Sequence, residues 1–271
     1  MKVAQKLLGC GLVLFLYGAF AGCSVPTSKP VIPLIHAHAH NDYAHRHPLF
    51  DALEQGFCSV EADIHLVDGK LLVAHDTNAL DPQRTLQSLY LEPLRARVKQ
   101  NGGRVYPNGP ECVLLIDFKT EAKTTYAALC VVLKEYSDIL SVFRDGKKET
   151  NAITAILTGP YPRVMLAADA VRYAAGDGKL LDLDKNPSSE LVPWISENWK
   201  KHFKWDGKGV MAAEEKQKLK QIVAKAHQQG RQVRFWNAPD QENFWTELLV
   251  DEVDLINTDD LKGVRKFYDA R

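Results

Sequence analysis

The alternation of strand-like and helix-like segments constrains the fold of this 271-residue chain more than any other feature. Apolar runs of strand length recur along it, and helical patterns fall between most of them. Such alternation favours parallel strands joined by helical crossovers. We expect eight strands, near residues 33–39, 58–65, 112–118, 152–158, 163–167, 191–196, 232–236 and 253–257. We expect helices near residues 47–55, 85–100, 121–136, 212–229, 241–250 and 259–269.

Two insertions interrupt this alternation. The pair Asp145-Gly146 predicts a hairpin turn. A Trp-rich loop spans residues 197–209 and contains Trp199 and Trp205, which we interpret as packing residues more readily than as substrate platforms.

The N-terminal segment predicts export. Lys2 and Lys6 precede an uncharged run that ends in Ala-Gly-Cys23, so residues 1–22 form the expected signal peptide. Ala-Gly-Cys resembles a bacterial lipobox, which implies lipidation of Cys23 and a tether over residues 23–32. The expected location is across the cytoplasmic membrane, as a periplasmic or cell-surface lipoprotein. Simple cleavage and release is the alternative.

The length, net charge and cysteine content of the chain limit the fold and the class of ligand that it can have. Residues 33–271 are enough for one α/β barrel, which typically needs about 250 residues. The 34 Lys and Arg residues balance the 34 Asp and Glu residues, so no net field would gather nucleic acid. Beyond Cys23, the mature chain has three cysteines, too few and too irregularly spaced for a disulfide framework or a zinc ribbon.

The stretch from Phe57 to Asp76 has acidic and imidazole groups where a buried strand should have none. Glu61, Asp63 and His65 fall on one face of the expected strand at period two. A solvated sheet face gives the same alternation, but this strand is flanked by further side chains that could take part in catalysis or bind a metal. They are His36, His38, His40, Asn41, Asp42, His75 and Asp76.

In a closed parallel barrel, the carboxyl ends of the strands converge on one mouth. The polar residues with that placement are His40, Glu61, Asp63, His75, Asp117, Lys119, Trp236, Asn237 and Asn257. The three carboxylates Glu61, Asp63 and Asp117 suit a hard divalent cation, Mg²⁺ or Ca²⁺. His40 and His75 beside such an ion suit proton transfer, because imidazole titrates near neutral pH. We interpret His36 and His38, deeper in the first strand, as barrel-filling or hydrogen-bonding residues.

Several motifs, taken in order, resemble those of the phosphatidylinositol phospholipase C-like phosphodiesterase superfamily. The resemblance is closest to its glycerophosphodiester phosphodiesterase and sphingomyelinase D-like branches, and it spans roughly residues 35–265. The motifs are His40-Asn41, Leu49 to Gly56, SVEADIHLVDGKLLVAHD, LLIDFK, RFWNAPD and LINTDD.

This resemblance implies a single (β/α)₈ TIM-type barrel and a phosphoric diester hydrolase. It implies that His40 and His75 are the acid/base pair, with His40 as base and His75 as acid by analogy. It also implies a metal site and a substrate pocket. The implied metal ligands are Glu61, Asp63 and Asp117, and the substrate-binding candidates are Asn41, Lys119, Trp236 and Asn257.

The chain departs from the glycerophosphodiesterase pattern at two places. It has His40-Asn41-Asp42 where those enzymes usually have His-Arg-Gly, so Arg46, Arg163 and Arg234 are candidates to replace the arginine. It has Asp117 where they have Glu, and Asp-x-Lys is the sphingomyelinase D-like form. The expected substrate is therefore a small or lysolipid-type phosphodiester, with the head group left open.

Two other functions remain as alternatives. His38-x-His40 matches the first-strand metal pair of an amidohydrolase or a polymerase-and-histidinol-phosphatase-like barrel. Such sites need ligating histidines on later strands, and after His75 only His202 and His227 remain. The other alternative is a non-catalytic lipoprotein that binds a phosphorylated ligand.

Overall fold

The structure is a computed structural model, which describes residues 31–271. The expected signal peptide and Cys23 lie outside the described residues, as does the tether up to residue 30.

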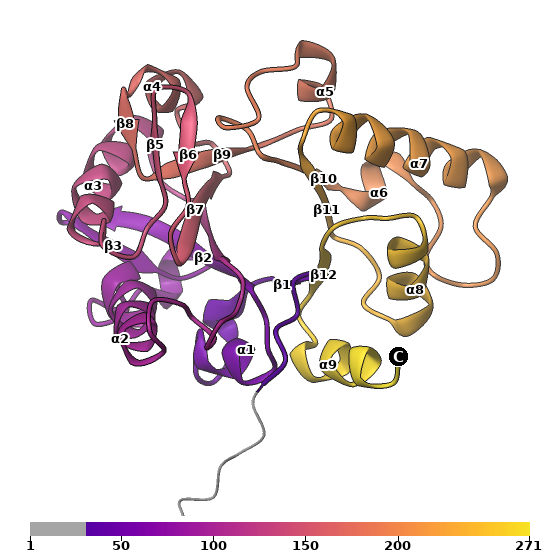
Figure 1. Ribbon diagram of the computed structural model, residues 1–271, viewed down its shortest axis with the longest axis horizontal. Coiled ribbons are helices and arrows are strands. Elements are labelled where there is room, and N and C mark those ends of the chain that lie inside the picture. The colour runs from indigo at the N-terminus through magenta and orange to yellow at the C-terminus, as the bar shows by residue number, and fades with distance from the viewer. Residues whose placement is uncertain (1–30) are drawn as a thin grey trace, which may run out of the picture. The chain divides into compact units, whose positions relative to one another are not determined.

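Eight parallel strands form a nearly closed barrel, with helices around its outside (Figure 1). Neighbouring strands follow the order β11-β10-β9-β7-β4-β2-β1-β12. A single bridge between Arg234 and Leu255 joins β11 to the segment that leads into β12. The barrel strands are β1 (Ala37–Ala39), β2 (Ser59–Val67), β4 (Cys112–Phe118), β7 (Ile153–Thr158), β9 (Ala174–Gly178), β10 (Trp194–Asn198), β11 (Gln232–Trp236) and β12 (Ile256–Thr258). The architecture confirms the predicted TIM-type barrel.

The helices cover the barrel with their apolar faces. In α7, for example, Leu219, Val223 and Ala226 are buried, at the spacing of one helical stripe. The α-helices are α1 (Phe50–Glu54), α2 (Glu92–Gln100), α3 (Ala122–Glu135), α4 (Arg163–Ala168), α5 (Asp182–Lys185), α6 (Trp199–His202), α7 (Ala213–Gln228), α8 (Glu242–Val250) and α9 (Leu261–Asp269). Three further helical segments are the 3₁₀ turns η1 (Asp42–Ala44) and η2 (Thr77–Ala79) and the π-helical segment η3 (Gln87–Leu91). Within residues 31–271, no helix combines the length and apolar character that a membrane crossing requires.

Four short strands lie outside the barrel order. β3 (Lys70–Val73) pairs antiparallel with β2 and leads to His75. β5 (Val142–Arg144) and β6 (Lys147–Glu149) form an antiparallel hairpin, and β8 (Val171–Arg172) joins β5. Asp145 and Gly146 connect the hairpin with positive φ angles of 52° and 69°, so the predicted turn is confirmed.

The expected fifth strand, residues 163–167, is wrong, because these residues form α4. Pro162 precedes this helix, and Met165 and Leu166 are good helix formers. The fifth barrel strand is β9, whose sequence Ala-Ala-Gly-Asp-Gly contains no β-branched residue. Packing explains Gly176, because a Cβ added there would lie 2.2 Å from the Tyr161 hydroxyl.

Trp199 belongs to the core and not to the mouth of the barrel. Its side chain is 1% exposed and stacks on Phe203, with ring centroids 4.1 Å apart. Phe235 and Phe244 meet its ring edge to face. The packing interpretation of Trp199 is therefore confirmed.

Candidate active site

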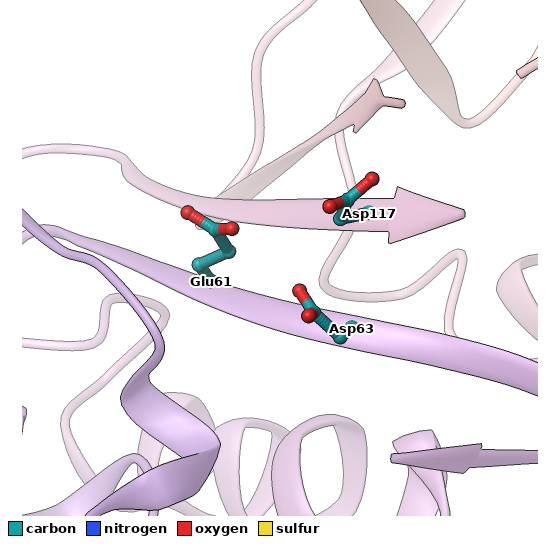
Figure 2. Close-up of side chains that lie close together, drawn as sticks. All are labelled: Glu61, Asp63 and Asp117. Carbon is teal, nitrogen blue, oxygen red and sulfur yellow. The ribbon is translucent and has the colours of Figure 1, made fainter. Parts of the chain in front are cut away.

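Three carboxylates from two neighbouring strands gather at the mouth of the barrel. Glu61 and Asp63 are two residues apart on β2 and share its inner face. Asp117 on β4 pairs in register with Asp63. Figure 2 shows the three side chains turned toward one another from these two strands. One oxygen from each lies within 4.8 Å of the other two.

The donor chemistry of this cluster fits a divalent cation. Burial and the charge of Glu61 raise the pKa of Asp63 to about 6, because crowded carboxylates resist ionisation. Asp63 Oδ1 is buried and has no hydrogen-bond partner among the described residues. Oxygen ligands of this kind are those that Mg²⁺ and Ca²⁺ prefer. Gly159 keeps the space open, since a Cβ there would lie 2.1 Å from Asp117 Oδ1.

Lys119 bridges two members of the cluster. Its Nζ donates to Asp117 Oδ2 at 2.6 Å and lies 2.9 Å from Asp63 Oδ2. Burial alone would lower the pKa of Lys119, but its hydrogen bonds to Asp117 and Asp63 and the charges of these two carboxylates together outweigh burial and raise it. The ammonium is therefore a fixed positive charge beside the carboxylates.

A buried pair of basic side chains holds the other end of the cluster. Glu61 Oε2 lies 3.0 Å from His38 Nε2 and 3.2 Å from Arg234 Nη1. Burial alone would raise the pKa of Glu61, but the hydrogen bond from His38 and the charge of Arg234 outweigh it and lower the pKa to about 2. His38 Nδ1 also bonds Ser59 Oγ at 2.7 Å, so both of its ring nitrogens are engaged. Because His38 and Arg234 both contact Oε2 of Glu61, Oε1 remains available to a metal ion. Because both ring nitrogens of His38 are hydrogen-bonded, neither is available for a His38-x-His40 metal pair.

His40 lies just beyond β1 and is oriented by Asp259. Its Nδ1 is 2.9 Å from Asp259 Oδ1, which leaves Nε2 as the ring atom available to a substrate. Burial alone would lower the pKa of His40, but the hydrogen bond to Asp259 and the negative charges of Glu61 and Asp259 together outweigh burial and raise it. A histidine oriented by a carboxylate suits a general base. Sequence reasoning missed Asp259, although an acidic residue at the end of a barrel strand is a recognisable indicator.

Asn41 and Tyr43 connect His40 to the carboxylate cluster. Tyr43 Oη lies 2.6 Å from Asn41 Oδ1 and 2.7 Å from Asp63 Oδ2, yet a hydroxyl has only one proton to donate. The Asn41 amide nitrogen donates to Asp259 Oδ1 at 3.3 Å, so the amide oxygen faces Tyr43. Asn41 Oδ1 and Asp63 Oδ2 therefore share the single proton of the Tyr43 hydroxyl. Sequence reasoning also missed Tyr43, whose partner Asp63 is distant in the chain.

The remaining predicted site residues line one cavity of about 510 Å³ with this cluster. His75 lies on the loop after β3, its side chain is 63% exposed, and its Nδ1 is 3.1 Å from Asp76 Oδ2. The cavity is also lined by Asn41, Trp236 and Asn257, and Asn257 Oδ1 accepts from Arg234 at 2.8 Å.

The candidate arginines differ in position. Arg234 lines the cavity, although it is only 3% exposed. Arg163 is paired with Asp182, and Arg46 lies in a separate surface cleft with His45 and His47. His36 is exposed and bonds the Asp254 carbonyl, so the barrel-filling interpretation is wrong for His36, which precedes β1.

Comparison with known proteins decides the family. The family model for the AIM6-like phosphodiesterase domain matches residues 26–174. Altered inheritance of mitochondria protein 6 from Eremothecium gossypii is 32% identical, over 89% of this chain and 71% of that protein. The chain belongs to the AIM6-like phosphodiesterase domain family. The homolog from Arthroderma benhamiae is 26% identical, over 89% of this chain and 86% of its own.

Solved structures similar to this AIM6-like domain show the same fold. A phosphodiesterase from Oleispira antarctica, solved with its product sn-glycerol-3-phosphate, superposes with a TM-score of 0.55 at 14% identity, over 86% of this chain and 96% of that one. A glycerophosphodiester phosphodiesterase from Parabacteroides distasonis gives a TM-score of 0.53 at 14% identity, over 89% of this chain and 97% of that one. The family model thus confirms the predicted phosphodiesterase family, and these structures confirm the barrel fold that the resemblance implied.

Proposed function

We propose that this AIM6-like domain is a divalent-cation-dependent phosphodiesterase that hydrolyses small, water-soluble glycerophosphodiesters. The observation that carries the proposal is the cavity that Glu61, Asp117 and Lys119 line together with His40 and His75, because the buried Asp63 completes a three-carboxylate cluster with Glu61 and Asp117. The structural neighbour that holds sn-glycerol-3-phosphate supports a substrate of this size.

The proposed chemistry divides the work between the two histidines. His40 Nε2 accepts a proton from the attacking hydroxyl, which belongs either to water or to a neighbouring group of the substrate. Asp259 stabilises the imidazolium that forms. His75 donates a proton to the departing oxygen, and its exposure allows exchange with solvent. Lys119 stabilises the negative charge on the phosphate oxygens.

Glu61, Asp63 and Asp117 would hold the cation, with the Glu61 carboxylate set in place by His38 and Arg234. A bound Mg²⁺ or Ca²⁺ would supply Lewis-acid stabilisation of the phosphate charge. His40 keeps its own partner, Asp259, so its orientation does not depend on a metal bond.

The cavity lining favours a polar substrate over an acylated one. Trp236 and Ala238 are the only apolar side chains that the lining contributes among the described residues; the others are charged or polar, or glycine. A fatty acyl chain would find little apolar surface here, so burying it would gain little free energy. A deacylated glycerophosphodiester has no such requirement.

The test is turnover of glycerophosphocholine with added cation, after chelation, and after restoring Mg²⁺ or Ca²⁺. We expect chelation to abolish turnover and either Mg²⁺ or Ca²⁺ to restore it, because all three proposed ligands are carboxylates. Asp63→Asn should weaken cation binding in calorimetry, and Asp68→Asn, on the turn between β2 and β3, is the matched control. Full activity after chelation, or restoration only by Zn²⁺, would overturn the carboxylate site.

A further inference from the structure

Lys179 contributes an uncommitted positive charge to the candidate active site. It follows β9 directly and lines the same cavity as Glu61 and Asp117. Its Nζ donates to the backbone carbonyl of Ser196 at 3.2 Å. Within residues 31–271, no carboxylate oxygen lies within 4.0 Å of that Nζ.

The other two cations of the cavity are already paired. Lys119 lies between Asp63 and Asp117, at 2.9 and 2.6 Å. Arg234 Nη1 lies 3.2 Å from Glu61. Arg234 Nη2 also lies 3.8 Å from Asp177, so Lys119 and Arg234 both face carboxylates, whereas Lys179 has none within 4.0 Å among residues 31–271 and is available to an anion of the substrate.

The backbone that presents Lys179 is well supported. The Lys179 N–H donates to Asp182 Oδ2 at 2.8 Å, and Asp182 is 4% exposed. Arg163 Nη2 donates to the same oxygen at 2.9 Å. Lys179 therefore extends from a fixed point at the end of a barrel strand and not from a loose loop.

The strand order sets the spacing between Lys179 and the carboxylate cluster. β9 is separated from β4 by β7 alone. Adjacent strands lie about 4.8 Å apart, so the ends of β9 and β4 lie about 10 Å apart. A diester whose phosphorus lies at the carboxylate cluster would place its head group about that far away, near the end of β9 and Lys179. On the other side of the mouth, the segments after β11 and β12 contribute Asp240 and Asp259.

We propose that Lys179 forms a subsite for an anionic substituent on the head group of the substrate, such as a phosphate monoester. This inference rests on the proposed function and adds a preference: glycerophosphodiesters with a negatively charged head group are better substrates than their uncharged counterparts. The acidic side of the mouth, near Asp240 and Asp259, receives the other arm of the diester.

The experiment compares two substrates that differ by one phosphate, glycerophosphoinositol and glycerophosphoinositol 4-phosphate. The readout is the ratio of their kcat/KM values, so a general loss of activity cancels. We expect the wild type to favour the phosphorylated substrate by about fivefold, the upper range for a solvent-exposed ion pair. Lys179→Met should bring the ratio close to one, and Lys179→Arg should keep it. Lys208→Met, a surface lysine paired with Asp206, is the control and should also keep the ratio.

A Lys179→Met variant that keeps the wild-type ratio would overturn the subsite, as would a wild type with no preference. Either result leaves the proposed function standing, because the diesters are still hydrolysed. A wild type that hydrolyses neither substrate would overturn the proposed function, and the subsite with it.

Discussion

Gly159 is the residue at which a single methyl group should disable the proposed metal site. It follows β7 with a φ of +72°, and an added Cβ would lie 2.1 Å from Asp117 Oδ1. Ordinary contact begins near 3.4 Å, so in Gly159→Ala the carboxylate must move by about 1 Å or more. The Phe118 carbonyl oxygen, 3.0 Å from the same Cβ, restricts relaxation of the backbone.

The displacement is large compared with the tolerance of a metal site. Ca²⁺–oxygen distances span only about 2.3–2.6 Å and Mg²⁺–oxygen distances about 2.0–2.1 Å, so a shift of about 1 Å removes Asp117 as a ligand. We expect the cation dissociation constant to rise by at least about 10- to 100-fold, the range found when only an outer hydrogen-bond partner of a metal ligand is lost. The left-handed backbone adds a separate cost of about 1 kcal/mol in unfolding free energy.

Gly146→Ala is the matched control. Gly146 has a φ of +69° in the β5–β6 hairpin, and a Cβ there meets nothing within 4 Å. Calorimetric titration with Mg²⁺ or Ca²⁺ and denaturant unfolding should be measured for both variants. Both should lose stability, but only Gly159→Ala should lose cation affinity. Wild-type affinity in a folded Gly159→Ala protein would refute the assignment of Asp117 as a ligand.

Three further predictions concern the histidines, a buried carboxyl group and the exported form. His40→Ala and His75→Ala should each lower kcat/KM by about 10²-fold or more; near-wild-type rates in either would remove that residue from the mechanism. Burial raises the pKa of Asp42 to about 7, so the protonated carboxyl stabilises the fold below about pH 4 and that contribution is lost as pH rises toward 7, at about 1.4 kcal/mol per pH unit. Asp42→Asn should flatten this slope in unfolding experiments from pH 4 to 8, and an unchanged slope would contradict the assignment. Cys23→Ser should release the protein from the membrane fraction or block its processing; a wholly soluble wild type without an acyl group on Cys23 would contradict the tether.

The barrel was predictable because most of its strands have a sequence pattern of their own. β2 and β4 carry long apolar or alternating runs, and amphipathic helices such as α7 separate later strands. The fifth strand was not predictable, because β9 consists of Ala, Gly and Asp residues that lack strand propensity, and close packing against Tyr161 leaves no room for a side chain at Gly176. Tertiary contact there overrides the local pattern.

The sequence also predicted which residues lie at the mouth of the barrel, from their positions along the expected strands. Glu61, Asp63 and Asp117 were placed together because parallel strands end at one face, and the structure brings their oxygens within 4.8 Å. The partners that orient these groups follow from geometry alone. Asp259, which follows β12 near the C-terminal end of the chain, is hydrogen-bonded to His40. Tyr43 in η1 is hydrogen-bonded to Asp63 in β2. No local spacing encodes such contacts.

The most direct test of the central claim, cation-dependent cleavage of a phosphodiester in this cavity, is a ³¹P NMR measurement. The cation-loaded protein is incubated separately with glycerophosphodiesters, lysophospholipids, phosphatidylinositol and sphingomyelin, each with and without chelator. The account predicts that the diester resonance of a glycerophosphodiester is replaced by that of a monoester or a cyclic phosphate, and that chelation prevents this. Diester resonances that persist for every substrate with Mg²⁺ and with Ca²⁺ would contradict the account and favour a protein that only binds a phosphorylated ligand.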